Sequence, residues 1–314
     1  MKLLFTSVGR RVELITQFKS SALKLGIDLI IYGADIDPTA PALMFCNKKV
    51  FTPKIYDPNY IDFLIDYCTV NEIDALIPTI DTDLSLLSKN KHKFRQTKVF
   101  ISSEEKIALS KDKRLTADYF TSLGLKTPKT VSDYRLYNMD FPAFIKPKDG
   151  SSSIYAYKAD SESELKSYVQ QVPDYIIQPF ISGTEYTIDI FCDYQGNPIY
   201  ITPRIRLAVR AGEVLKTKIC QDHTIIEDMK ILINDFKPCG PITVQMIKHE
   251  TSGEKFYIEI NPRFGGGAPL SMYAGANSAE MLLKMLTGEA IKYIPQAAED
   301  GAVFSRFDQS IRVN

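Results

Sequence analysis

The segment that decides the fold is residues 257–263, which read Tyr-Ile-Glu-Ile-Asn-Pro-Arg. Successive side chains of a β-strand point to opposite faces, so the two isoleucines are predicted to face a core. Glu259, Asn261 and Arg263 then share the other face of the strand. Pro262 cannot donate to a β ladder and is expected to end the pairing. The segment therefore brings a carboxylate, an amide and a guanidinium onto one surface.

These side chains have the chemistry of a magnesium site. Magnesium prefers hard oxygen ligands, usually one or two carboxylates together with phosphate oxygens and water. The Glu259 carboxylate and the Asn261 amide oxygen suit it, and Arg263 can clamp a phosphate or carboxylate beside them. Gln245 lies on the preceding predicted strand, which a hairpin at 251–253 joins to this one, so it can come alongside Glu259. A strand with a solvated polar face is the alternative interpretation.

Two lysines precede this segment in positions suited to phosphate binding. Lys146 ends a predicted strand and precedes residues 147–153, a Gly/Ser loop whose N–H groups and hydroxyls, Ser152 among them, can hold phosphate oxygens. Lys113 lies near the start of a helix predicted over 111–123. The loop has one glycine and is no Walker motif, so solvated lysines are the alternative.

A short extended segment follows that can present its backbone to an adenine ring. The Pro179 carbonyl can accept from the amino group of the base, and the Ile181 N–H can donate to a ring nitrogen, while Gln178 and Phe180 flank them. Proline is tolerated there because its missing N–H is not required. Glu185 can accept hydrogen bonds from ribose hydroxyls. An ordinary strand exit with a Ser-Gly turn is the alternative.

Arginines gather on a later predicted strand, residues 201–209. Arg204, Arg206 and Arg210 fall on one face of this strand and its exit. Three guanidinium groups facing together indicate an anionic substrate or phosphoryl oxygens. A solvated basic face paired with nearby carboxylates is the alternative.

The first hundred residues alternate short apolar runs with helical patterns, such as 12–25 and 60–70. This alternation predicts a doubly wound, mostly parallel sheet, in which ligands bind beyond the carboxyl ends of the strands. Asp35 and Asp81 lie at such ends and are candidate substrate contacts, with turn chemistry and helix capping as the alternative. The first turn lacks the full GxGxxG pattern, which argues against a dinucleotide site. The predicted strands are residues 3–6, 29–32, 50–52, 75–78 and 99–101.

Composition narrows the class of protein further. The chain has 314 residues, of which 45% are hydrophobic, and its 38 basic residues balance 38 acidic ones. The chain therefore has no net positive charge whose electrostatic field would attract nucleic acid or an anionic membrane. The five cysteines form no CxxC pair or zinc-like cluster, and no stretch approaches 18 consecutive apolar residues. We expect a soluble cytoplasmic protein with reduced thiols.

The order of these features resembles the ATP-grasp superfamily, in particular the ATP-binding modules of carbamoyl-phosphate synthase large subunit and biotin carboxylase. The resemblance covers almost the whole chain, and its most specific part is the set Gln245, Glu259, Asn261 and Arg263. It implies an α/β fold with a Rossmann-like preATP-grasp domain at 1–109, followed by two α+β lobes. The lobes would be a small, lid-bearing lobe at 110–182 and a large lobe with the metal site at 183–314. The other matching elements are Asp112-Lys113, Leu123-Gly124-Leu125, Phe144 to Pro147, Gln178 to Ile181 and Gly183 to Glu185.

The resemblance also implies an activity. The chain would be an ADP-forming carboxylate–amine ligase that uses ATP and Mg²⁺, with Mn²⁺ as another option, and it can be a homodimer. Lys113 and Lys146 would bind the ATP phosphates, and Arg263 with Arg210 would stabilise charge during phosphoryl transfer. Its partners would be a small-molecule carboxylate and an amine. The alternatives are a nucleotide-binding module without ligase chemistry and a kinase that stops at phosphoryl transfer. The single module excludes carbamoyl-phosphate synthase itself, and the missing C-terminal region argues against biotin as substrate.

Overall fold

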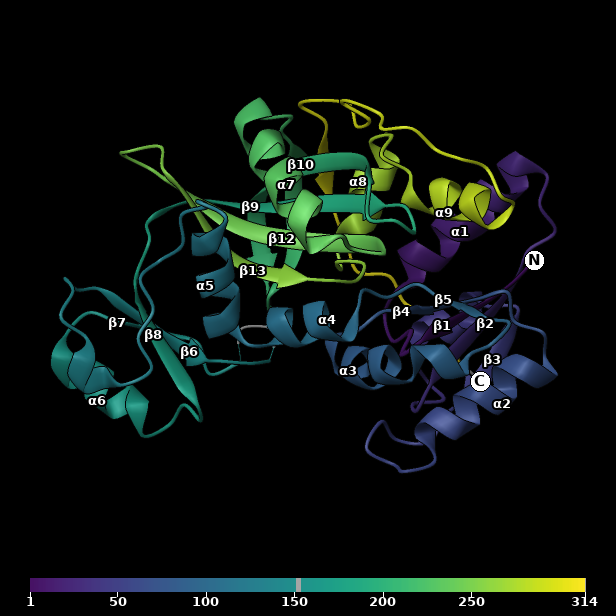
Figure 1. The fold of residues 1–314 in the computed structure, drawn as a ribbon, viewed down its shortest axis with the longest axis horizontal. Helices are drawn as coiled ribbons and strands as arrows, with labels where there is room; N and C mark the ends of the chain where they lie inside the picture. Colours follow the sequence, from purple (N-terminus) through teal and green to yellow (C-terminus); the bar gives the residue numbers. More distant parts are fainter. Residues whose placement is uncertain (151–153, 314) are drawn as a thin grey trace.

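The computed structural model describes residues 1–150 and 154–313, and its strands form three separate sheets (Figure 1). The first sheet is five-stranded and parallel, with order β3-β2-β1-β4-β5. This confirms the predicted doubly wound sheet. The order reverses between β1 and β4, so the carboxyl ends of these two strands form the point where such sheets bind ligands. Its elements are β1 (Lys2–Thr6), α1 (Val12–Leu25), β2 (Ile30–Asp35), β3 (Lys48–Phe51), α2 (Tyr60–Val70), β4 (Ala75–Pro78), α3 (Asp81–Asn90) and β5 (Lys98–Val99).

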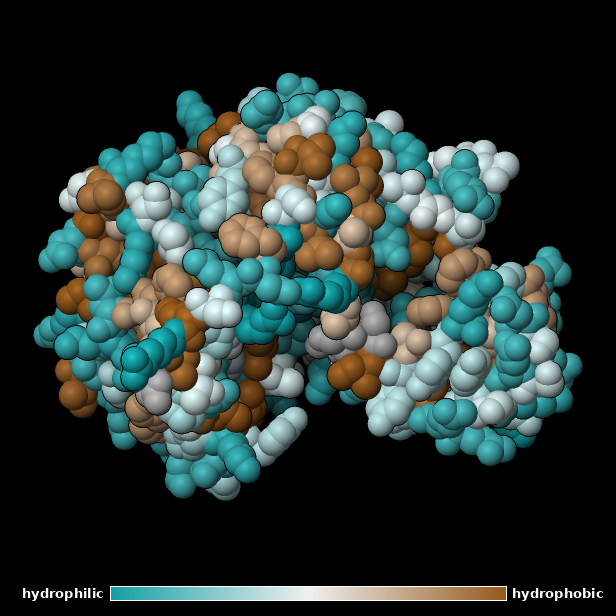
Figure 2. All heavy atoms as spheres, turned by 180° about the vertical axis from the view of Figure 1, so that it is seen from behind, coloured by the Kyte–Doolittle hydropathy of each residue, from teal (hydrophilic) through white to brown (hydrophobic). Residues whose placement is uncertain are grey.

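The second sheet is small and antiparallel, with order β7-β6-β8. Its own core includes Ala143, Ile145, Leu165 and Ile177. Seen from behind, this lobe stands apart from the body of the molecule across a hollow (Figure 2). Its elements are β6 (Ala143–Pro147), β7 (Tyr157–Ala159), α6 (Glu162–Val169) and β8 (Tyr175–Pro179).

The third sheet has six strands in the order β13-β12-β9-β10-β11-β14, with antiparallel neighbours. Helix α7 packs Ile225, Met229, Leu232 and Phe236 into the same core as the buried side chains of β9, β10 and β12. The elements are β9 (Gly183–Cys192), β10 (Pro198–Arg210), β11 (Glu213–Ile219), α7 (His223–Phe236), β12 (Gly240–His249), β13 (Lys255–Asn261), α8 (Ala268–Tyr273), α9 (Ser278–Leu286) and β14 (Val303–Ser305).

Two short helices connect the first sheet to the small lobe, where the sequence predicted one helix over 111–123. Helix α4 (Glu104–Lys111) ends at Asp112, whose extended backbone breaks the helical hydrogen bonding. The Asp112 side chain then accepts from the Arg114 N–H at 2.9 Å and caps α5 (Lys113–Ser122). Phe120 of α5 packs in the core of the third sheet, so core packing crosses the predicted boundary at 182. The domain boundaries themselves remain predictions.

A shared aromatic core holds the first and third sheets together. The ring of Phe5 on β1 lies 4.9 Å from that of Phe18 on α1, edge to face. Phe18 in turn lies 6.1 Å from Phe264, just beyond β13. Helices α1 and α9 lie side by side in this region (Figure 1). This packing fixes the strand ends of the first sheet close to the end of β13.

None of the helices in the described part of the chain has the length and apolarity needed to cross a bilayer.

Candidate functional site

The residues of the predicted metal set lie on two paired strands. Gln245 of β12 is directly opposite Glu259 of β13 in the antiparallel ladder. Asn261 lies two residues further along β13, on the same face, and its Nδ2 donates to Glu259 Oε1 at 2.9 Å. Arg206 Nη1 donates to Gln245 Oε1 at 3.2 Å. The register thus places three oxygen-bearing side chains at one end of the sheet, as expected.

This donor set fits magnesium held jointly with a nucleotide. It has one carboxylate, from Glu259, and two amide oxygens. Among residues 1–150 and 154–313, no three His, Cys, Asp or Glu side chains gather so as to hold a metal ion. A cation at Glu259 therefore depends on further oxygens from a ligand, and magnesium bound with ATP phosphates meets that condition.

Lys146 and Lys113 line one cavity, which we call the lysine cavity. It has a volume of about 490 Å³, and its wall includes Phe144, Glu185 and Glu259. Lys146 is 8% exposed. Burial lowers the pKa of Lys146 to about 8; Glu259 opposes this shift, and Lys113 adds to it. An anion entering the cavity would raise this pKa again, because it stabilises the charged form of the lysine.

The predicted hinge begins in β8 and continues beyond it, and none of its residues, from Gln178 to Ile181, is among those that line the lysine cavity. The Gln178 side chain is buried and donates to Thr130 Oγ1 at 2.8 Å. The Phe180 N–H donates to the Pro142 carbonyl at 2.9 Å. Its ring lies 6.3 Å from that of Phe144 in the cavity wall.

The remaining residues of the nucleotide prediction differ in their placement. Pro179 ends β8, and Ile181 lies between that strand and β9. Glu185 faces the lysine cavity and forms an ion pair with Arg206, with 3.1 Å between Oε2 and Nη1. Ser152, the predicted phosphate contact of the loop, lies outside the described residues.

Arg204 and Arg206 line a second cavity of about 320 Å³, which we call the arginine cavity. Arg204 is 2% exposed, and its Nε donates to Asp189 Oδ2 at 2.7 Å. Ser271 Oγ donates to the same oxygen at 2.7 Å. Arg204 Nη1 is buried without a hydrogen-bond partner among the described residues. The cavity wall also contains Arg11, Asp81, Glu213, Gln245, Glu259, Asn261, Arg263 and Gly265 to Gly267.

Arg210 does not join this array, which corrects the prediction of three arginines on one face. The β10–β11 ladder shifts register between Arg206 and Ala208 and again between Ala208 and Val209. These bulges break the alternation on which the prediction relied. The Arg210 side chain is 56% exposed, and it forms two hydrogen bonds with Asp308, at 3.0 and 2.6 Å.

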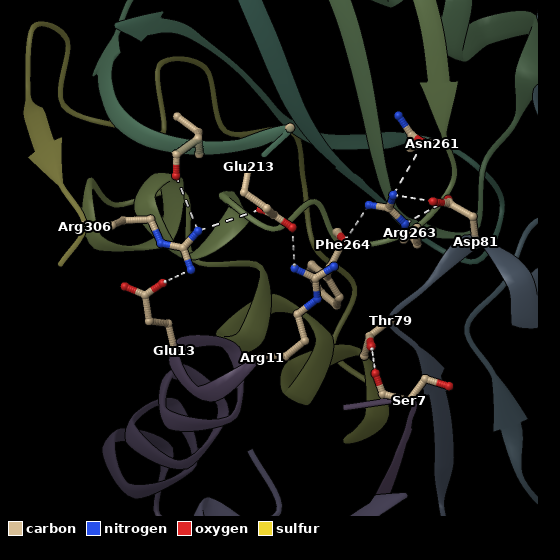
Figure 3. Close-up of polar contacts among 12 residues, drawn as sticks. Ser7, Arg11, Glu13, Thr79, Asp81, Glu213, Asn261, Arg263, Phe264 and Arg306 are labelled. Atoms are coloured by element: carbon tan, nitrogen blue, oxygen red, sulfur yellow. Dashed lines mark hydrogen bonds and ion pairs between the residues drawn. The ribbon is translucent and has the colours of Figure 1, made fainter. Parts of the chain in front are cut away.

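Arg263 reaches across to the first sheet, and Figure 3 shows its guanidinium between Asp81 and Asn261. Asp81 begins α3 at the switch point of the first sheet. The pair brings this predicted substrate contact to the wall of the arginine cavity. Asp81 is therefore engaged by Arg263.

Asp35, the other predicted substrate contact at a strand end, accepts hydrogen bonds from nearby backbone N–H groups. One carboxylate oxygen accepts from the Gly9 N–H at 2.8 Å, and the other accepts from the Asp37 N–H at 2.9 Å. This arrangement matches the alternative of turn chemistry. Asp83, two residues after Asp81 on α3, accepts hydrogen bonds from Thr6 Oγ1 and Ser7 Oγ at 2.7 and 2.9 Å.

Sequence reasoning missed an ion-pair network that borders the arginine cavity (Figure 3). Arg11 Nη1 lies 3.3 Å from Glu213 Oε1. Arg306 lies 3.8 Å from the other oxygen of Glu213 and 3.0 Å from Glu13. The network joins α1, β11 and the C-terminal segment. No local pattern marks these residues, because they meet only through the tertiary fold.

A third cavity, of about 690 Å³, lies beside the first two, and its wall combines six aliphatic side chains with polar and charged ones; we call it the apolar cavity. It shares Lys113, Asp149 and Gly150 with the lysine cavity. It shares Asp81 and Asn261 with the arginine cavity. Glu259 lines all three cavities. The three spaces therefore converge on the carboxylate of the predicted metal set.

The chain is similar to known proteins over most of its length. Residues 3–101 match the family described as "PylC-like, N-terminal domain". Residues 171–306 match the family described as "ATP-grasp in the biosynthetic pathway with Ter operon".

Among curated relatives, the 3-methyl-D-ornithine–L-lysine ligase of Methanosarcina mazei is 26% identical over 71% of this chain and 58% of its own length. A carbamoyl-phosphate synthase of Methanobrevibacter smithii is 23% identical over 72% of this chain and 68% of its own length. The chain thus spans less than two thirds of the lysine ligase relative.

Among solved structures, the biotin carboxylase domain of 2-oxoglutarate carboxylase from Hydrogenobacter thermophilus superimposes with a TM-score of 0.77. The alignment covers 96% of this chain and 73% of that one, at 16% identity. Two family matches in the expected order, on the expected fold, establish that the chain is an ATP-grasp protein.

Proposed function

We propose that the chain is an ATP- and Mg²⁺-dependent, ADP-forming ligase that activates a small-molecule carboxylate as an acyl phosphate and couples it to an amine. One observation carries the proposal: the lysine cavity and the arginine cavity meet at Glu259. A phosphate donor in the first and a carboxylate in the second would then be neighbours. Catalysis of phosphoryl transfer is mainly positioning and electrostatic stabilisation, which two adjoining cationic cavities supply.

The chemistry assigns distinct tasks to the two cavities. Lys113 and Lys146 hold the phosphates, the segment from Gln178 to Ile181 borders the adenine, and Glu185 accepts from the ribose. Magnesium, held by Glu259 with Asn261 and Gln245 and bound to phosphate oxygens, would neutralise the charge of the nucleotide. Mn²⁺ in its place and assembly as a homodimer stay predictions.

Arginines would then orient the acid. Arg204 and Arg206 hold its carboxylate, and an oxygen of that group attacks the γ-phosphorus as the bond to the ADP oxygen breaks. Arg263 stabilises the charge on the transferring group. The amine next attacks the acyl carbon, the bond to phosphate breaks, and the nitrogen loses a proton. The relatives support this reaction class, since one that matches over most of this chain is named a ligase of two amino acids.

Trapping with hydroxylamine tests the proposal. The protein is incubated with Mg-ATP, hydroxylamine and single carboxylic acids, and both ADP and hydroxamate are measured. An acyl phosphate reacts with hydroxylamine, so a ligase yields the two products in equal amounts. The same assay on Glu259→Gln at the same Mg²⁺ concentration should show much less of both products, whereas Glu254→Gln, an exposed change on the hairpin that joins β12 to β13, should behave as wild type.

The two alternatives give different results in this assay. A nucleotide-binding module binds ATP in calorimetry and releases no ADP with any acid. A kinase acting on a hydroxyl releases ADP and a stable phosphorylated product, with no hydroxamate. Either result would refute the ligase assignment.

A further inference from the structure

We propose that the apolar cavity holds an apolar side chain of the acid substrate, so that the enzyme selects aliphatic or aromatic amino acids or related acids. This inference rests on the proposed ligase function and names the substrate class of the same site. It concerns the part of the substrate that does not react.

The walls of the cavity carry the argument. Six aliphatic side chains from five parts of the fold line it: Ile55, Ile61, Leu84, Leu86, Ile107 and Ile260. Its volume of about 690 Å³ is within the usual range for small-molecule sites, roughly 300–1,000 Å³. Ile61, Leu84, Ile107 and Ile260 are all buried, so they form a fixed wall.

The polar groups closest to the proposed reaction centre lie at the boundary of this cavity with the other two, whereas Asp57, Ser85, Ser110 and Lys111 line it elsewhere. Asp81, Glu259 and Asn261 lie where the arginine cavity begins, and Lys113 lies where the lysine cavity begins. A carboxylate placed at this junction, beside the transferring phosphate, can therefore extend its other end among the aliphatic groups.

A charged side chain of a substrate would fit poorly among the aliphatic side chains of this cavity. A charge or strong dipole placed against the aliphatic side chains would lose its water without gaining a partner, which is unfavourable in apolar surroundings. The charged residues at the outer rim, Asp57 and Lys111, are exposed to solvent. An apolar side chain, by contrast, gains from leaving water.

Two substitutions test the inference without disturbing the converging polar groups. Ile55 is partly buried and lies between β3 and α2, outside any helix or strand. Ile55→Glu places a carboxylate in the cavity, and Ile55→Val is its matched control. Ser85 of α3 also faces the cavity and is partly exposed, so Ser85→Phe reduces the space with little strain on the core.

ADP release is measured with alanine, norleucine, phenylalanine, serine, glutamate and lysine as separate acids. We expect norleucine and phenylalanine to give the highest kcat/KM. Ile55→Glu should raise the KM for norleucine by about tenfold or more with kcat nearly unchanged, and Ile55→Val should stay close to wild type. Ser85→Phe should impair phenylalanine and spare alanine. Highest activity with glutamate or lysine, or an equal effect of Ile55→Glu on every acid, would overturn the inference.

Failure of the ligase proposal would look different. If no acid supports ADP release, the ligase proposal fails. Calorimetry with phenylalanine added to the Mg-ADP complex then tests, independently of catalysis, whether the apolar cavity binds an apolar ligand. Binding that Ile55→Glu abolishes and Ile55→Val retains supports an apolar ligand site. No binding to the wild-type complex refutes it.

Discussion

The Arg263 guanidinium, just beyond β13, forms a bidentate ion pair with the Asp81 carboxylate at the start of α3. Nε lies 2.8 Å from Oδ1, and Nη2 lies 2.5 Å from Oδ2. Burial alone would lower the pKa of Arg263, but the charge and hydrogen bonds of Asp81 outweigh it, so the pKa is raised. The pair ties the switch point of the first sheet to the end of β13, the strand that carries Glu259 and Asn261 of the proposed metal set. It therefore sets the geometry of the wall shared by the arginine and apolar cavities.

Breaking this pair should destabilise the protein measurably. Asp81→Ala leaves a largely buried guanidinium without its carboxylate, and we expect a loss of about 1–3 kcal/mol in the free energy of unfolding. A double-mutant cycle with Arg263→Ala should show a coupling energy of about 1–3 kcal/mol in urea denaturation. The exposed pair Lys126–Glu254 is the control and should give a coupling of about 0–1 kcal/mol. Additive losses at Asp81 and Arg263 would contradict the assignment.

The pH dependence of ATP binding should report on Lys146. Its pKa is lowered to about 8 by burial, so the free protein holds a charged lysine below pH 8 and a neutral one above it. Bound phosphates favour the charged form, so binding above pH 8 must take up a proton. We expect the ATP affinity to be nearly constant from pH 6.5 to 7.5 and to fall by up to about tenfold per pH unit above pH 8. Calorimetry across this range measures it.

The matched variant for this prediction is Lys146→Arg. A guanidinium stays charged throughout the range, so the variant should bind ATP with little change in affinity up to pH 9.5. The same fall above pH 8 in both proteins would show that another group titrates.

The depressed pKa also has a consequence for folding. Since the unfolded chain holds the Lys146 proton up to about pH 10.5 and the folded chain loses it near pH 8, the contribution of Lys146 to stability should rise between these values.

Local sequence patterns were enough to predict the first sheet and the pairing of the two strands that carry Gln245 and Glu259. The helices at 12–25 and 60–70 have the predicted bounds, and the hairpin logic that placed Gln245 beside Glu259 is confirmed by the β12–β13 register. Helix α7 was missed although its apolar residues, from Ile225 to Phe236, recur at helical spacing. Helix α3 is also absent from the predicted elements, because Asp81 in its first turn directly follows an apolar run and has the pattern of a polar strand end.

The parts of the site that sequence could not predict depend on long-range packing. Arg11 and Glu213 are 202 residues apart, and Asp81 and Arg263 are 182 apart. No periodicity connects such positions. The Arg210 prediction was wrong for a local reason, since two register shifts after Arg206 have no signal in the apolar pattern of β10.

The metal requirement should depend on Glu259. Replacing this carboxylate by the isosteric amide in Glu259→Gln removes the charged ligand, and we expect the Mg²⁺ concentration for half-maximal ADP release to rise by about tenfold or more. Titration of Mg²⁺ at fixed ATP, with an acid that supports turnover, measures this shift. Glu254→Gln on the same hairpin should leave the titration unchanged. An unaltered Mg²⁺ requirement in Glu259→Gln would exclude Glu259 as a metal ligand.

Close packing of backbone against Arg204 should make Gly267 sensitive to a single methyl group. A Cβ at this position would lie 2.6 Å from Arg204 Nη2 and 2.5 Å from Val214 Cγ1, although the backbone conformation itself suits alanine. Gly267→Ala should therefore displace the guanidinium, cost about 1–3 kcal/mol in unfolding free energy, and raise the KM for the acid while leaving the ATP affinity unchanged. Gly253→Ala is the control, because its φ of +69° strains alanine but its Cβ would meet open space. It should lose about 1 kcal/mol of stability with both affinities intact. If Gly267→Ala altered stability alone, Arg204 would have no part in binding the acid.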